Sequence, residues 1–129
     1  MKKLMVVVMV LASVFIASAL KAQSLDGVVT GIKKGNATQV TDNASESFSL
    51  TIMDKSGNYK KADAQKAITD FFTKNTVKGF DVKHKGNSPN GQYAIGTLTT
   101  SGGNYRVNIF MKKDGDKEII KELRFQLLE

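Results

Sequence analysis

The sequence contains no cysteine and no tryptophan, and it has one histidine and one proline. Without cysteine the chain can form no disulfide, no thiol nucleophile and no cysteine-bound metal site. The lack of cysteine also excludes lipid attachment at a lipobox, so we expect a protein that is not a lipoprotein. Gly-rich phosphate loops, G-x-S-x-G elbows and H-E-x-x-H motifs are missing as well. We therefore assign no catalytic residue, no metal site and no cofactor.

The first 22 residues resemble a targeting segment. Lys2 and Lys3 form a basic start, Leu4–Ala17 is apolar, and small residues follow up to Ala22. This order is typical of a secretory signal peptide. The apolar run of about 14 residues is shorter than the roughly 20 that a membrane span needs. We expect cleavage after Ala22, with Ala19 as the alternative, and an exported protein, periplasmic or secreted, without a membrane span after cleavage.

The net charge gives no sign of a nucleic-acid partner. The formal charge of +7 falls to +4 when Lys2, Lys3 and Lys21 leave with the signal peptide. The remaining lysines are scattered in ones and twos among acidic residues, which is ordinary for a soluble domain and unlike a basic binding surface. Residues 23–129 have the length of one small domain.

Hydrophobic spacing predicts helices first and strands afterwards. Helices are predicted over residues 24–34, 37–43 and 62–75. Strands are predicted over residues 46–54, 79–86 and 118–127, with a turn at 55–58, a short partner strand at 59–60 and a hairpin over 93–111 that turns at 101–104. Helices followed by a run of antiparallel strands indicate an α+β fold with the helices on one face of the sheet.

Alternation along the strands divides their side chains between a core face and an outer face. The residues predicted to face the core are Tyr93, Ile95, Thr97, Thr99, Tyr105, Val107, Ile109, Met111, Phe80, Val82, His84, Ile119, Leu123, Phe125 and Leu127. Three apolar residues, Leu98, Phe110 and Ile120, are predicted on the outer face among charged neighbours. This composition is typical of a protein contact, and we interpret the three as interface candidates, for example of a homodimer.

Four polar residues are candidates for a ligand pocket. His84 could act as a general base, but Asp81 points to the opposite face, so a structural role is the alternative. Tyr93 and Tyr105 could line a pocket with their phenols, or could close its open end with the hydroxyls in water. Asp54 could reach the pocket, or could begin a turn instead.

Several segments resemble a known family when taken in order. They are Gly35-Asn36-Ala37 after an apolar helix, Leu50–Asp54, Tyr59 leading into Ala62–Phe72, Tyr93–Leu98, and Leu123-Arg124-Phe125. Together they resemble the small secreted proteins of Bacteroidota grouped as domain of unknown function family 4783. Members of this family are similar to the nuclear transport factor 2-like, or cystatin-like, roll.

The resemblance implies a curved antiparallel sheet wrapped around a long helix, with a short helical segment before it and a conical cavity between. It carries no known activity. Enzymes of the wider roll place a Tyr/Asp or His/Asp pair in the cavity, and neither pair can be matched in this sequence.

Three functional hypotheses follow. The first is a non-catalytic exported module that binds a small apolar or amphipathic ligand in the cone, or a protein partner through the sheet. The second is a small isomerase- or hydrolase-like enzyme that uses His84 with a tyrosine or aspartate. The third is a structural protein whose cavity is filled by its own side chains.

Overall fold

A computed structural model describes residues 24–42 and 44–128. Its elements are α2 (Ser24–Lys34), α3 (Ala37–Thr41), β1 (Ala44–Ile52), β2 (Lys55–Lys60), α4 (Lys61–Lys74), β3 (Val77–Ser88), β4 (Gly91–Thr100), β5 (Gly103–Asp114) and β6 (Lys117–Leu127). The predicted signal peptide and its cleavage sites lie outside the described residues. Within the described part, no helix has the length and hydrophobicity to cross a membrane.

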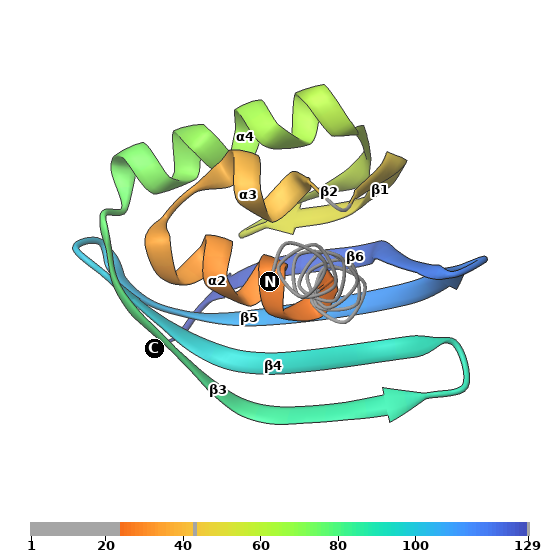
Figure 1. Cartoon of the computed structure of the whole chain (residues 1–129). Coiled ribbons are helices and arrows are strands. Elements are labelled where there is room, and N and C mark those ends of the chain that lie inside the picture. The colour runs from red at the N-terminus through yellow and green to blue at the C-terminus, as the bar shows by residue number, and fades with distance from the viewer. Residues whose placement is uncertain (1–23, 43, 129) are drawn as a thin grey trace, which may run out of the picture.

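The strands form one six-stranded sheet in the order β2-β1-β6-β5-β4-β3. Strands β3 to β6 form an antiparallel meander, and β1 joins it by pairing in parallel with β6. The sheet curves, and all three helices lie on its concave side, with α4 over the β1–β2 end and α2 over β3 and β4 (Figure 1). The predicted α+β architecture is confirmed.

The chain leaves α2 through a glycine cap, as its sequence predicts. Gly35 has a φ of 65°, and its N–H donates to the Ile32 carbonyl. The N–H of Asn36 donates to the Gly31 carbonyl, which completes a Schellman-type ending. The Asn36 side chain then accepts from the N–H of Gln39 and begins α3. One short segment thus ends a helix and starts the next.

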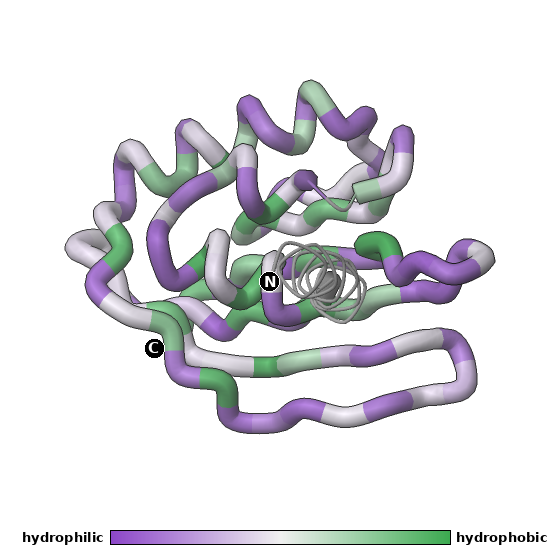
Figure 2. The backbone as a smooth tube through the Cα atoms, in the orientation of Figure 1, coloured by the Kyte–Doolittle hydropathy of each residue, from purple (hydrophilic) through white to green (hydrophobic). Residues whose placement is uncertain are grey.

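Helix side chains fill the concave side of the sheet. Leu25, Val28 and Ile32 of α2, Val40 of α3 and Ile68 of α4 are all at most 1% exposed. An aromatic cluster joins α4 to the sheet, with the Phe71 ring 4.9 Å from the rings of both Tyr105 and Phe125. Hydrophilic residues recur along α4 and β3, the outermost elements (Figure 2). The centre of the cone that the family resemblance implies is therefore occupied by α2 and α3.

The predicted faces are correct for β5 and wrong for β4. The hairpin turns through two residues, Ser101 and Gly102, whereas four were predicted, and Leu98 pairs with Tyr105 and shares its face. A turn of two or of four residues places the even-numbered residues of β4 on the face of Tyr105, so the predicted grouping of Tyr93 with Tyr105 does not fit either turn. The inward residues of β4 are Ala94, Gly96, Leu98 and Thr100. Leu98 is 0% exposed, and its predicted place on the outer face is wrong.

Small residues face inward on β4 because other groups take up the space above them. A Cβ atom at Gly96 would lie 2.8 Å from the Phe80 ring and 2.5 Å from the Asp81 carbonyl oxygen. The larger Tyr93, Ile95 and Thr97 face outward, where their side chains have room. The prediction failed because it placed the larger residues of β4 inside and did not take into account that Phe80 and the Asp81 carbonyl crowd this face.

A bulge in β3 reverses the predicted side of His84. Val82 pairs with Gly96 and His84 pairs with Ile95, so β3 contains one extra residue, Lys83, at this point. Phe80 and Val82 follow the predicted inward face, but His84 is turned outward with Ile95 and is exposed.

A second bulge reverses part of β6. Phe110 pairs with Glu122 but Met111 pairs with Ile120, which leaves Lys121 as the extra residue. Ile120 is 0% exposed, so its predicted place on the outer face is wrong, and Ile119 is turned outward. Leu127, predicted in the core, is 50% exposed near the end of the strand.

We predict that Gly31→Ala lowers the free energy of unfolding by about 1–2 kcal/mol, although alanine is the better helix former. A Cβ atom at Gly31 would lie 2.8 Å from the backbone nitrogen of Val40, so α3 would have to move away from α2. Thermal and urea unfolding measure the effect. Gly79→Ala is the control, because no atom lies within 4 Å of a Cβ there. A Gly31→Ala protein as stable as the wild type would contradict the packing.

Candidate functional site

A groove of about 480 Å³ lies between α4 and the β1–β2 hairpin. Its lining residues are Ile52, Met53, Asp54, Lys55, Tyr59, Ala67, Asp70, Phe71, Lys74 and Asn75. The apolar members are half-buried or buried except for Met53, and the four charged members are exposed. The groove therefore has an apolar floor with charges at its rim, and its volume is within the range of small-molecule sites.

The groove exists because small residues occur where the helix faces the hairpin. Lys55, Gly57 and Tyr59 share the inner face of β2, since they pair with Ile52, Leu50 and Phe48 of β1. A Cβ atom at Gly57 would have only the Tyr59 ring within 4 Å. On the other side, Ala67 is the half-buried residue of α4 in the lining. Short side chains on both walls keep the space open.

Met53 lies at the groove in an unusual backbone conformation. The hairpin turns through Met53 and Asp54, two residues earlier than predicted, so that β2 runs over Lys55–Lys60. Met53 is the only non-glycine among the described residues with a positive φ, 57°, and it is 46% exposed. Glycine is the usual residue for positive φ in such turns. Strained residues of this kind cluster at functional sites.

Asn75 closes the other end of the groove. Its side-chain oxygen accepts a hydrogen bond from the Tyr105 hydroxyl at 3.0 Å, and its side-chain nitrogen donates to the Phe71 carbonyl at 3.0 Å. Tyr105 is 3% exposed. The Tyr105 hydroxyl thus holds the end of α4 against the sheet, and its hydrogen bond is made to Asn75.

The four predicted pocket residues do not come together. Asp54 lines the groove, at the turn of the hairpin. Tyr105 is on the core face as predicted, but it is buried behind Asn75. His84 and Tyr93 are on the outer face of the sheet, so their predicted place on the core face is wrong. The sequence indicated that Ala67 and Phe71 face inward, but it gave no sign that they line a groove with Tyr59.

The outer face carries an apolar patch different from the predicted one. Tyr93 pairs with Phe110 across β4 and β5, with ring centroids 6.4 Å apart, and Ile95 follows on the same face. The Tyr93 ring also covers Gly86, where a Cβ atom would lie 2.7 Å from the phenol oxygen. Of the three interface candidates, only Phe110 belongs to this face.

Next to the patch lies an unusual polar atom. The Oδ1 atom of Asn108 is buried and has no hydrogen-bond partner among the described residues. Asn108 lies two residues from Phe110 on β5 and pairs with Ile95. Buried polar atoms are normally paired, so an unpaired one calls for a physical explanation.

The described residues contain no group of three or more side chains that could hold a metal ion. The groove contains carboxylates and ammonium groups but no histidine.

The fold is similar to that of solved structures with low sequence identity. An NTF2-like protein of unknown function from Cytophaga hutchinsonii matches with a TM-score of 0.60 and 10% identity, over 81% of this chain and 87% of that one. A domain of unknown function with a cystatin-like fold from Nostoc punctiforme matches with a TM-score of 0.63 and 11% identity, over 88% and 77%. The protein therefore has the NTF2-like, or cystatin-like, α+β fold.

The family is defined by closer matches. Residues 25–126 match the model of the domain of unknown function DUF4783. A DUF4783 protein from Bacteroides ovatus is 36% identical with a TM-score of 0.76, over 80% of this chain and 94% of that one. The chain belongs to the DUF4783 family, and the resemblance seen in the sequence is confirmed. No curated protein matches the chain.

We predict that Tyr105→Phe lowers the free energy of unfolding by about 1 kcal/mol, because it leaves the partly buried Asn75 oxygen without its donor. Tyr93→Phe is the matched control, since no hydrogen bond of the Tyr93 hydroxyl occurs in the described part, and its stability is expected to stay within about 0.5 kcal/mol. Urea unfolding measures both. Equal stability of the two variants would mean that the Tyr105–Asn75 bond does not hold α4.

Proposed function

We propose that this protein is an exported, non-catalytic binding module that takes an apolar group into the groove between α4 and the β1–β2 hairpin. The observation that carries the proposal is the groove's floor, formed by Ile52, Tyr59, Ala67 and Phe71 beneath an exposed charged rim. Most ligand sites combine an apolar lining with a few polar groups in this way. Export is supported by the signal-like order of residues 1–22.

The position of Met53 favours binding over a merely structural hollow. An exposed methionine has a flexible and polarisable side chain that adapts to apolar ligands of different shapes. At this turn a glycine would avoid the positive-φ cost of roughly 1–2 kcal/mol. A strained methionine at the mouth of an apolar groove is consistent with selection for contact with a ligand.

The enzymatic alternative has less support. Catalysis by His84 with a tyrosine or aspartate needs these side chains within hydrogen-bond reach in one pocket. His84 is on the outer face of β3, whereas Asp54 lines the groove on the concave side and Tyr105 is bonded to Asn75. A small apolar or amphipathic ligand, with its polar end at the lysines or aspartates of the rim, fits the groove better.

We predict that Ala67→Leu weakens the binding of an apolar probe, 8-anilinonaphthalene-1-sulfonate, by about tenfold or more, because the larger side chain occupies the groove. Fluorescence titration measures the dissociation constant. Ala62→Leu is the matched control, since it makes the same change on an exposed residue of the same helix outside the groove. The proposal is wrong if the wild type binds no probe, or if Ala67→Leu binds as well as Ala62→Leu.

A second proposal concerns the outer sheet face. We propose that Tyr93, Ile95 and Phe110 form the centre of a homodimer contact, with the Arg124–Glu122 ion pair at its edge. An apolar centre with a polar edge is the usual composition of such contacts.

For this contact we predict that Phe110→Asp raises the dimer dissociation constant by about a hundredfold or more, because two copies of a charge would be buried at the centre. Sedimentation velocity over a concentration series measures the association. Leu127→Asp, which changes an exposed apolar residue outside the patch, is expected to leave the dimer intact. A wild-type protein that remains monomeric at millimolar concentration would overturn the homodimer.

A further inference from the structure

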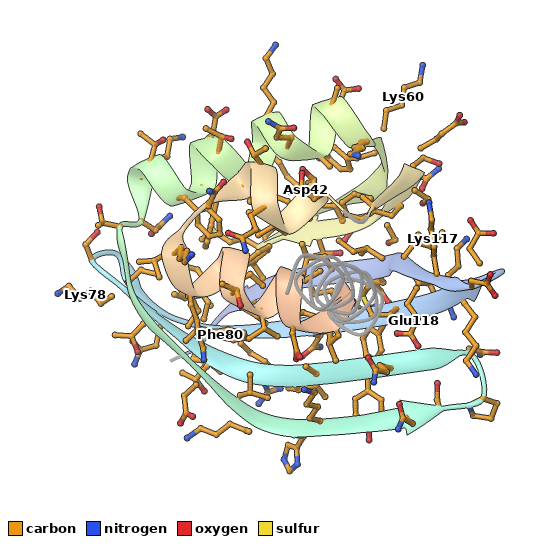
Figure 3. All side chains as sticks on the ribbon, in the orientation of Figure 1. Asp42, Lys60, Lys78, Phe80, Lys117 and Glu118 are labelled. Carbon is orange, nitrogen blue, oxygen red and sulfur yellow. The ribbon has the colours of Figure 1, made fainter. Side chains whose placement is uncertain are left out.

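The sheet has two edges, and one of them is protected against further pairing. β3 forms the protected edge, with breaks in its pairing register between Val77 and Gly79 and between Val82 and His84. Three exposed lysines, Lys78, Lys83 and Lys85, also lie along it. Bulges and lysines are the features by which natural sheets prevent the addition of another strand. In Figure 3, Lys78 projects away from the protein at this edge.

The edge formed by β2 contains no bulge, and its two lysines, Lys55 and Lys60, lie at the ends of the strand. All six residues of β2 pair with β1 in a continuous register from Lys55 to Lys60. Its central residues, Ser56-Gly57-Asn58, carry no charge, and every residue of the strand is exposed or half-buried. This edge can therefore accept a further strand.

The hairpin geometry determines which backbone groups are free. In a hairpin with a two-residue turn the flanking residues, Ile52 and Lys55, form a hydrogen-bonded pair. The pairs then alternate, so Gly57 and Tyr59 also bond to β1. The Oγ atoms of Thr51 and Ser56 lie 2.9 Å apart, as expected for the closer side chains of a non-hydrogen-bonded pair. The N–H and C=O groups of Ser56 and Asn58 accordingly point away from β1, to the free edge.

The groove and this edge are adjacent. Lys55 and Tyr59, both on the inner face of β2, line the groove. A strand added beside β2 would direct every second side chain to that same face. An apolar side chain opposite Gly57 would point toward the groove, whereas its neighbours would face solvent.

We propose that the ligand is an extended peptide that pairs with the free edge of β2 and places one apolar side chain in the groove. This rests on the proposed function and specifies its ligand. The backbone supplies the affinity and the groove supplies the side-chain selection, which is the general mode of recognition by strand addition.

Charge indicates which peptides fit. β2 carries Lys55 and Lys60 and no carboxylate, and Lys60 extends into solvent where the strand meets α4 (Figure 3). The carboxylates Asp54 and Asp70 are on the groove rim. A peptide with an apolar residue near its centre and an acidic residue at the end beside Lys60 therefore matches the strand, whereas at the other end Asp54 offsets the charge of Lys55.

The test is selection of random dodecapeptides displayed on phage against the purified protein, followed by fluorescence anisotropy with the enriched peptide. Asn58→Pro removes one outward N–H, and proline is tolerated on an edge strand where that N–H faces solvent. We expect Asn58→Pro to weaken peptide binding about tenfold or more, through the lost hydrogen bond and the bulk of the ring. Asn58→Ala keeps the N–H and is expected to bind like the wild type.

The dye titration separates this inference from the proposed function. Asn58→Pro is expected to keep its binding of 8-anilinonaphthalene-1-sulfonate, whereas Ala67→Leu is expected to lose both dye and peptide. If Asn58→Pro does not fold, N-methylation of the peptide amides that face β2 makes the same test, with the same expected loss. The inference is overturned if no peptide is enriched, or if neither Asn58→Pro nor N-methylation weakens binding. Dye binding that is lost in Ala67→Leu would then still support the groove.

Discussion

The packing of α2 and α4 into the concave side of one curved sheet is the constraint on which the rest of the structure depends. Leu25, Val28 and Ile32 fill the centre, and Phe71 joins α4 to Phe125 of β6. Since burial of apolar area is the main favourable term in folding, each strand must present its inward side chains in agreement with these helices. Gly31 and Gly96 have no side chain where α3 and Phe80 come close.

The same constraint explains why binding is proposed at the border of the fold. The centre of the cone is filled by α2 and α3, so open space remains where α4 leaves the filled core and faces only the β1–β2 hairpin. There Gly57 and Ala67 are short, and the turn at Met53 is strained. The two proposed binding surfaces, the groove with the β2 edge and the outer patch at Phe110, lie on opposite faces of the sheet and could be occupied independently.

Much of the architecture was predictable from local patterns. The bounds of α2 matched the predicted helix, Gly35 and Asn36 ended it as expected, and α4 and the alternation of β5 were also predicted correctly. The candidate site was predicted less well. Of the four pocket residues only Asp54 lines the groove, and of the three interface residues only Phe110 faces outward.

The sequence by itself determined the types of the elements, their order and the α+β class, because helical and strand periodicities are properties of neighbouring residues. Only the tertiary structure decided which face each strand presents. The turn at Ser101-Gly102 places Leu98 opposite Tyr105, and the single extra residues Lys83 and Lys121 each shift a register by one position, which exchanges inside and outside. His84 and Ile120 were misplaced by these bulges and Leu98 by its pairing with Tyr105, because the side that each residue faces depends on the register in which neighbouring strands pair.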